Sequence, residues 1–314
     1  MKRFECIQRH QEELPVSELC ECLEVSASGY YAWVNRKPSA RSQADEGYKG
    51  RITTLHKRSK ARYGHRPIYH HLREEGLACG RDRTRRLMKE LAIEGLQKKG
   101  FKPLGTDSRH DFGYHPNWLK ENGKPTACNQ VWVADTTYLR TAQGWSYLAT
   151  VMDLFSRRII GWSLSDRNDS ALCGRALQAA FLTRSRESLH NLIHHSDRGS
   201  TYASYDYQKL LTSRGLIPSM SAKGNCYDNA AMESFFGRFK ISSTGDVTFA
   251  DHDHARSTAF EYIETFYNRF RKHSAIGYNT PVAFEEKIFP PGGNQPSLSA
   301  CFNSNPHLHQ NQRN

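Results

Sequence analysis

The 314-residue sequence contains no C-x-x-C pair and no long hydrophobic run. Its eight cysteines are scattered, and Cys20 and Cys22 form the only close pair. Reduced, mostly buried thiols are therefore favoured over a disulfide framework, and a metal held by that pair with His10 is the weaker alternative. Because no stretch of about 18 apolar residues is present, we expect no membrane span. The charged N-terminus lacks the apolar core of a signal peptide, which favours a cytoplasmic protein.

Positive charge is concentrated in one segment. The net charge is +12, and residues 36–104 hold 19 Lys or Arg against 7 Asp or Glu, whereas the rest of the chain holds 25 of each. Evenly spread charge would indicate only solubility. A local surplus indicates a partner with a phosphate backbone, bound with release of counterions, although a solvated basic linker is the alternative.

The first hundred residues have the pattern of helices. We expect an N-terminal helical segment at 1–40 and a basic, helix-turn-helix-like DNA-binding domain at 41–100. Two helices are expected in the basic domain at 41–100. Pro67 suits the first turn of one helix, which Gly76 ends. Asp82 can cap the other helix, which ends near Gly95.

The helix that Asp82 is expected to cap is rich in basic residues near its start. Cations at a helix N-terminus oppose the helix dipole, so helix stability does not explain them. A recognition helix that lies in a DNA groove would explain them, and a solvated helix face is the alternative. The candidate DNA-binding residues are Arg81, Arg83, Arg85, Arg86 and Lys89.

Strands and helices alternate in the second half of the chain. The pattern predicts a three-stranded antiparallel meander followed by α-β-α-β-α, which is the order of a ribonuclease-H-like α/β domain with a mixed five-stranded sheet and flanking helices. The predicted strands are Val131–Leu139, Trp145–Asp153, Arg158–Ser165, Leu192–Ser196 and Ile217–Met220, and the predicted helices are Ser170–Arg186, Tyr205–Arg214 and Asn229–Lys240.

The remaining segments complete the predicted domain organisation. An amphipathic helix at 255–270 is expected to place Phe260, Ile263, Tyr267 and Phe270 on one stripe. The predicted parts are a linker at 101–128, a catalytic core at 129–245, a C-terminal helical extension at 246–290, and a disordered tail at 291–314.

Three acidic residues are the candidate catalytic and metal-binding residues. Asp135 shares a strand face with two valines, where a buried carboxylate is costly unless a cation offsets its charge. Asp197 follows a short apolar run, at the strand edge where ligands bind in such sheets. Glu233 lies inside a helix, and Lys240 follows two turns later as a candidate DNA-phosphate contact.

Such a set of carboxylates suits a pair of Mg²⁺ ions. Hard cations take few protein carboxylates and complete their coordination with water and substrate phosphate. Two ions can activate the attacking oxygen and stabilise the leaving oxygen of a phosphodiester, with no nucleophilic side chain. A salt-bridged or exposed carboxylate is the ordinary interpretation of any one of these acids taken alone.

Other polar residues near these three acids could belong to the site or have structural roles instead. Asp153 also stands at a strand end. Asp228, or Asn229 in its place, is expected to cap the helix that carries Glu233. His194 and His195 precede Asp197, and packing is favoured for both over catalysis.

Three motifs, WVADTTYL, HHSDRGSTYAS and KGNCYDNAAMESFFGRFK, resemble the catalytic core of bacterial insertion-sequence transposases of the IS-three family and, more distantly, that of retroviral integrases. The resemblance covers roughly residues 15–288. It implies DNA transposition with strand cleavage and joining that depends on Mg²⁺ or Mn²⁺. It also implies that Asp135, Asp197 and Glu233 are the metal ligands and that Lys240 touches the transposon end.

The resemblance also sets expectations about partners. DNA ends and target DNA are the implied substrates, bound by a homo-oligomer in the bacterial cytoplasm, in association with the nucleoid. Because no sustained heptad repeat is present, the chain resembles the product of a downstream reading frame, with the upstream product as a possible partner. Two alternatives are a nuclease of the same fold that does not join strands and a catalytically idle DNA-binding regulator.

Overall fold

The structure is a computed structural model that describes residues 2–96, 115–184, 189–221, 229–243 and 248–288. The predicted tail, residues 101–114 of the predicted linker, and Asp228 lie outside these ranges. Among the described helices, none combines the length and the apolar character that crossing a membrane requires.

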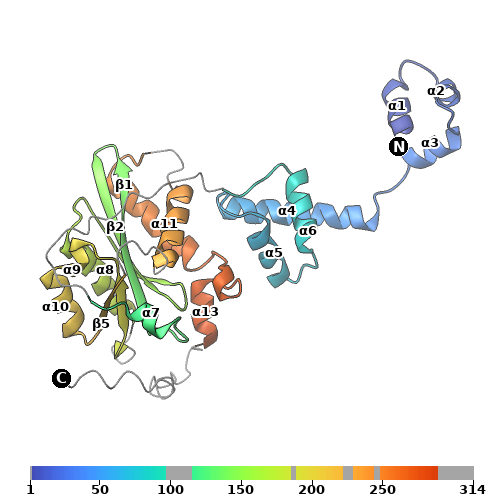
Figure 1. Cartoon of the computed structure of the whole chain (residues 1–314). Helices are drawn as coiled ribbons and strands as arrows, with labels where there is room; N and C mark the ends of the chain where they lie inside the picture. Colours follow the sequence, from blue (N-terminus) through green and yellow to red (C-terminus); the bar gives the residue numbers. More distant parts are fainter. Residues whose placement is uncertain (1, 97–114, 185–188, 222–228, 244–247, 289–314) are drawn as a thin grey trace.

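Three short helices form the N-terminal segment. Helices α1 (Lys2–His10), α2 (Val16–Cys22) and α3 (Ala27–Val34) pack around a small core of Ile7, Cys20 and Tyr30. The side chain of Ser26 caps α3 by accepting a hydrogen bond from the amide of Gly29. This unit stands apart from the rest of the chain (Figure 1).

A second helical unit consists of α4 (Ala40–Arg58), α5 (His65–Glu74) and α6 (Arg81–Glu90). The positive φ of Gly76 ends α5 as predicted. Helix α6 differs from the prediction because it begins one residue before Asp82, with Gly80 at its N-cap. It also ends before Gly95, because Ala92 adopts a left-handed conformation.

The catalytic core contains the predicted mixed sheet. Its strand order is β3-β2-β1-β4-β5, with β1, β2 and β3 antiparallel and β4 and β5 parallel to β1. The strands are β1 (Val131–Thr141), β2 (Gly144–Asp153), β3 (Ile159–Ser165), β4 (Ile193–Ser196) and β5 (Ile217–Met220). The order of strands and helices expected for a ribonuclease-H-like domain is confirmed.

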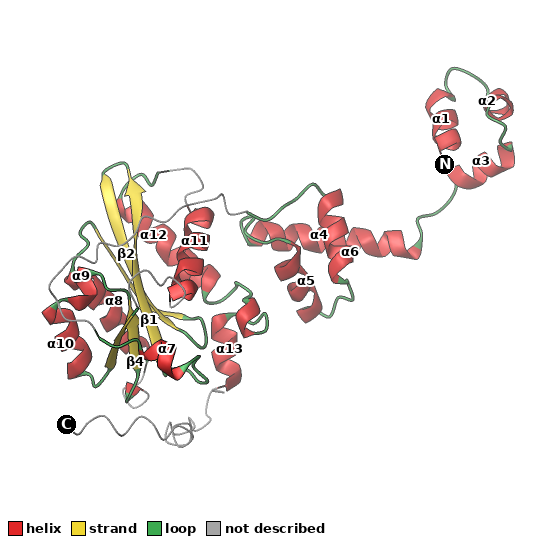
Figure 2. Ribbon diagram, in the orientation of Figure 1, coloured by secondary structure: helices red, strands yellow, loops and turns green. Residues whose placement is uncertain are grey.

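Helices cover both faces of this sheet (Figure 2). Trp132 and Ala134 of β1 pack with α8 (Ser170–Thr183) and α10 (Tyr205–Ser213), whereas Val131 and Val133 pack with α11 (Ala230–Ser243). The alternation of a β-strand places Asp135 on the side of Val133, and hence on the α11 face. Two further short helices are α7 (Trp118–Asn122), within the predicted linker, and α9 (Ser200–Ala203).

The C-terminal extension corrects one prediction. It contains α12 (His252–Phe260), a π-helical segment η3 (Glu261–Tyr267), a 3₁₀ turn η4 (Ser274–Ile276) and α13 (Pro281–Ile288). Phe260 is 56% exposed and does not join the predicted apolar stripe. Helix α12 instead packs through the small residues Ala255 and Ala259, and the change to π-helix at Glu261 alters which residues face inward.

The second helical unit is joined to the core through η3 and the segment that follows it. One hydrophobic cluster runs from Ile52 and Leu72 of the helical unit to Tyr262 and Phe266 of η3. The hydroxyl of Tyr63 donates to the carbonyl of Phe270 at 2.7 Å and accepts from the amide of Lys272 at 3.1 Å. Across the same junction, Arg62 forms a bidentate salt bridge with Glu261.

Candidate active site

The three candidate carboxylates belong to three different elements. Asp135 lies on β1, Asp197 follows β4 directly, and Glu233 lies in the first turn of α11. Strands β1 and β4 are parallel neighbours in which Val133 stands opposite His195. Asp135 and Asp197 each lie two residues beyond this pair, at the carboxyl end of β4. Asp135 is therefore on a strand, Asp197 at a strand end and Glu233 on a helix, as the sequence indicated.

Asp135 is electrostatically coupled to the other two acids, although the ligand atoms of Asp135, Asp197 and Glu233, all within the described residues, do not gather within 4.8 Å of one another. The pKa of Asp135 is raised to about 8, first by burial and then by the nearby carboxylates of Asp197 and, to a smaller extent, Glu233. The amide of Thr136 and the side chain of Asn229 oppose this shift through hydrogen bonds of 2.8 Å each to the Asp135 carboxylate. A cluster of acids in this state is stabilised by a bound cation.

This donor set fits a hard divalent ion. It consists of carboxylate oxygens alone, without the thiolate or imidazole ligands that zinc sites use. Glu233 is exposed, and Asp197 and Asp135 are half-buried, so water and a substrate phosphate can reach the site. Asp197 is also held by the chain, because one of its oxygens accepts the amide of Gly199 at 2.9 Å.

Lys240 lies on the same side of the sheet as these acids. Its ammonium group is 4.3 Å from the centre of the Tyr138 ring, three residues beyond Asp135 on β1. Burial lowers the pKa of Lys240, and the carboxylate of Asp135 partly opposes that shift. The contact of Lys240 with DNA therefore stays a prediction.

Asn229 is a site residue that sequence reasoning missed. It was expected to be an alternate helix cap, but its side-chain amide donates to Asp135 from just before the start of α11. Its carbonyl oxygen is buried and has no hydrogen-bond partner within the described structure. The sequence signal was its position four residues before Glu233, on the same helical face.

The two histidines before Asp197 are packing residues. His194 lies against Tyr207, with its Nε2 atom 3.1 Å from the tyrosine hydroxyl. Burial, followed by the neighbouring His195, lowers the pKa of His194 to about 3, so its imidazole stays neutral. His195 is fully buried between the hydroxyl groups of Ser219 and Ser221, at 2.9 and 3.0 Å.

Asp153 has a structural role at the opposite end of β1. It pairs with Trp132 in the sheet register, and its carboxylate accepts the amides of Asn129, Phe155 and Ser156. These hydrogen bonds fix the turn that follows β2. Burial raises the pKa of Asp153, in spite of these bonds and of Arg184 nearby.

Asp153, Cys128 and Glu285 form a cluster with the spacing of a metal site, because their ligand atoms lie within 4.8 Å of one another. Arginine side chains already neutralise it. Arg184 contacts Glu285 directly and lies 3.8 Å from Asp153, and Arg158 is 2.6 Å from Glu285. Guanidinium groups therefore supply the positive charge that a metal would bring. Within the described structure, His10, Cys20 and Cys22 do not form such a cluster.

The basic residues of α6 differ in their surroundings. Asp45 binds Arg83 at 2.7 Å and Arg86 at 2.8 Å, and Arg86 also pairs with Glu90, so both guanidinium groups are engaged within the helical unit. Arg85 and Lys89 instead line a cleft between this unit and the core. Arg81 is exposed and lies 3.8 Å from Asp82.

Family models match most of the described chain. Two models described as "Integrase core domain" match residues 125–226 and 214–281, and a model described as "HTH-like domain" matches residues 43–101.

Two curated relatives align over nearly their full lengths. The Insertion element IS600 uncharacterized 31 kDa protein of Shigella sonnei is 46% identical over 86% of this chain and 98% of its own length. The Transposase InsF for insertion sequence IS3A of Escherichia coli is 38% identical over 91% of this chain and 99% of its own. Among solved structures, the catalytic core domain of HTLV-2 integrase in complex with magnesium matches with a TM-score of 0.40 and 16% identity, covering 51% of this chain and 99% of that one.

Proposed function

Because the chain belongs to the InsF-type transposase family of IS3 insertion sequences, we propose that it is a DNA transposase that cleaves transposon ends and joins them to a target through Asp135, Asp197 and Glu233. The observation that supports this assignment is the placement of the three acids, with Asp135 on β1, Asp197 directly after the parallel neighbour β4, and Glu233 in the first turn of α11 on the Val133 face of the sheet.

The proposed reaction consists of two phosphodiester exchanges. In the first, water loses a proton as it attacks the phosphorus at the transposon end, and the bond to the 3′ oxygen breaks. The flanking strand keeps the phosphorus as a 5′-phosphate, and the 3′ oxygen leaves as a 3′-OH after gaining a proton. In the second, this 3′-OH attacks a target phosphodiester and loses its proton, and a new 3′ oxygen leaves in turn. Mg²⁺ or Mn²⁺ ions, two in the proposed site, would activate the attacking oxygen and stabilise the leaving oxygen.

The chain's own residues position these reactants. Asp135 and Asp197 would hold the ions from the sheet, and Glu233 would hold them from the first turn of α11. Lys240 would contact a phosphate of the end, two turns along the same helix. The helix-turn-helix-like unit would bind the end DNA, and two ends require a homo-oligomer, with the upstream reading-frame product as a further proposed partner.

Strand cleavage and joining test this proposal. Purified protein is incubated with Mg²⁺ and DNA that carries the inverted repeats flanking the gene, and the products are separated on denaturing gels. We expect Glu233→Gln and Asp135→Asn to abolish both steps while DNA binding persists. The matched control is Asp206→Asn, since Asp206 is an exposed acid in the first turn of α10. Cleavage without joining would indicate a nuclease, and binding without metal-dependent turnover would indicate a regulator.

A further inference from the structure

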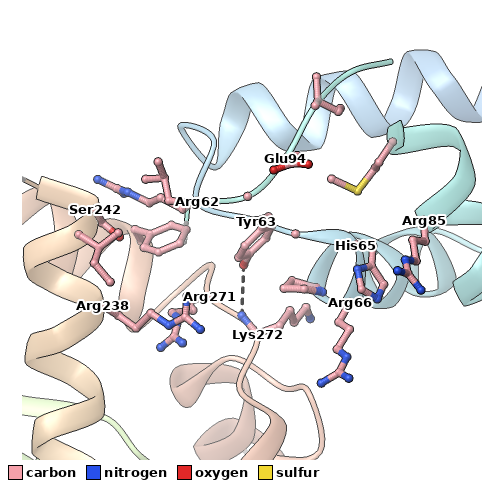
Figure 3. Close-up of a pocket in the computed structure, with 18 of the residues that line it drawn as sticks. Arg62, Tyr63, His65, Arg66, Arg85, Glu94, Arg238, Ser242, Arg271 and Lys272 are labelled. Carbon is pink, nitrogen blue, oxygen red and sulfur yellow. Dashed lines mark hydrogen bonds between the residues drawn. The ribbon is translucent and has the colours of Figure 1, made fainter. Parts of the chain in front are cut away.

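A cleft of about 960 Å³ lies between the helix-turn-helix-like unit and the core. One wall consists of residues of α5, α6 and the chain on either side of them, and the other consists of α11, η3 and the segment after η3 (Figure 3). The cleft is separate from the acidic site, although α11 contributes to both.

The lining of this cleft is strongly basic. It includes seven Arg or Lys side chains and a single acid, Glu94. Two of the cations are engaged in holding the junction together, since Arg62 pairs with Glu261 and Lys272 pairs with Glu74. The other five form no salt bridge with any described residue, and these are Arg66, Arg85, Lys89, Arg238 and Arg271.

Positive charges of α5 and α6 lower the pKa of one shared neighbour, His65. His65, which lines the cleft at the start of α5, has a pKa lowered first by burial and then by Arg66, Arg85 and Arg81. Figure 3 shows His65 lying between Arg66 and Arg85. Asp82 opposes this shift, and Glu94 is the acid in the lining, so the cations outnumber the acids and the cleft favours a polyanionic occupant.

The walls of the cleft are held in place before any ligand binds. A side-chain carbon at Gly95 would lie 2.4 Å from the amide nitrogen of Gly64, so the chains before α5 and after α6 touch through their backbones. On the other side, the Tyr63 hydroxyl is tied to Phe270 and Lys272. A preformed cleft binds its ligand with a small entropic cost.

Helix α11 connects the cleft to the acidic site. Arg238 faces the cleft and lies between Glu233 and Lys240 in the sequence. At 1.5 Å per residue, Arg238 is about 7.5 Å along the helix axis from Glu233. At 3.6 residues per turn, Arg238 is also rotated by about 140° around the helix from Glu233, so a strand bound at both sites would pass around α11.

We propose that this cleft binds the sugar-phosphate backbone of the end DNA as it passes from the helix-turn-helix-like unit to the acidic site. The inference rests on the proposed function, because it takes the substrate to be DNA. Guanidinium and ammonium groups suit phosphate oxygens, and the contacts would not depend on base sequence. The cleft therefore adds affinity and sets the path of the strand, while recognition of the end sequence occurs elsewhere.

Salt-dependent binding tests this inference. All variants carry Glu233→Gln and are measured in EDTA, so that binding is followed without chemistry, by fluorescence anisotropy from 50 to 300 mM KCl. Arg66→Gln alters the α5 wall, Arg238→Gln alters the α11 wall, and a double variant alters both. Each lost phosphate contact is expected to reduce the slope of log K against log salt by about one, equally for end DNA and scrambled DNA.

Lys209→Gln is the matched control, because Lys209 is an exposed cation on α10, on the opposite face of the sheet. Thermal unfolding verifies that each variant is folded. An unchanged salt slope in Arg238→Gln would overturn the inference, and so would a loss confined to end DNA. The proposed function is judged separately, by strand joining in protein that keeps Glu233. If that protein joins strands and Glu233→Gln does not, the proposed function stands even when the cleft inference fails. If that protein does not join strands although the cleft variants change the salt slope as expected, the proposed function is rejected and the cleft inference stands.

Discussion

The side-chain amide of Asn229 donates a 2.8 Å hydrogen bond to Oδ2 of Asp135, which joins the start of α11 to the middle of β1. The other oxygen of Asp135 accepts the amide of Thr136. Both carboxylate oxygens are therefore oriented by the chain. Because α11 also carries Glu233, this bond fixes the distance between the helix and the strand that supply two of the proposed metal ligands.

Replacing Asn229 should weaken metal use without weakening DNA binding. Residues that orient metal ligands typically contribute 10- to 100-fold to metal affinity or activity, and we expect Asn229→Ala to fall in that range of about 10–100. A titration of cleavage rate against Mg²⁺ should show a higher half-saturating concentration. If both the half-saturating concentration and the maximal rate match those of the parent protein, Asn229 does not position Asp135.

Gly161 permits the close packing of β3 against α8. A side-chain carbon at this position would lie 2.2 Å from the Ala176 carbonyl oxygen and 2.5 Å from the Ala180 amide nitrogen. Gly161→Ala should therefore destabilise the core by about 1–3 kcal/mol or more, as overpacking does. Gly174→Ala, on α8 itself, is the control, since only Leu210 lies within 4 Å at 3.9 Å. Urea unfolding should show a lower midpoint for the first variant and an equal or higher midpoint for the second.

The sheet and the acidic site were predictable because their determinants are local. Alternation along β1 placed Asp135 with Val131 and Val133, and the short apolar run before Asp197 indicated a strand end. Pairing of these strands then followed from the order of elements. The placement of the three acids on these elements required no knowledge of any particular side-chain contact, whereas their role as metal ligands stays a prediction.

Features that depend on contacts between distant residues were not predictable. Tyr63 bonds to Phe270 across 207 residues, and no periodic pattern marks either one as part of a domain junction. The π-helical segment from Glu261 has the same apolar composition as an ordinary helix, so the exposure of Phe260 was unexpected. Arg83 was predicted to contact DNA, and that prediction could not take account of Asp45, which binds its side chain from α4.

The cluster around Glu285 should depend on arginine and not on a metal. Removing one partner of a buried ion pair leaves an uncompensated charge, which typically costs about 3–5 kcal/mol. We therefore expect Glu285→Gln to lower the thermal unfolding temperature, because it leaves Arg184 buried beside Asp153. Neither EDTA nor added Zn²⁺ should change the unfolding temperature of the parent protein through this cluster. Stabilisation by Zn²⁺ that disappears in Cys128→Ser would show instead that the cluster binds metal.

The junction between the helical unit and the core should weaken at low pH because of His71, which stacks on Phe270 at 4.8 Å. Burial lowers the pKa of His71 to about 4. This value includes the effects of Lys272 and Arg58, which lower the pKa, and of Glu74 and Glu75, which raise it. The unfolded chain, with an ordinary histidine pKa of about 6.5, binds the proton more readily than the folded chain.

Stability from His71 is therefore complete above about pH 6.5 and is lost as the pH falls towards about 4, by up to about 3 kcal/mol. His71→Phe keeps an aromatic ring against Phe270 and removes the titrating group, so the free energy of unfolding should fall less steeply over this range than in the parent protein. Urea unfolding at half-unit steps from pH 4 to pH 7 measures this difference. The exposed His190 provides the control variant His190→Phe. Equal pH slopes for His71→Phe and the parent protein would show that the proton is taken up elsewhere.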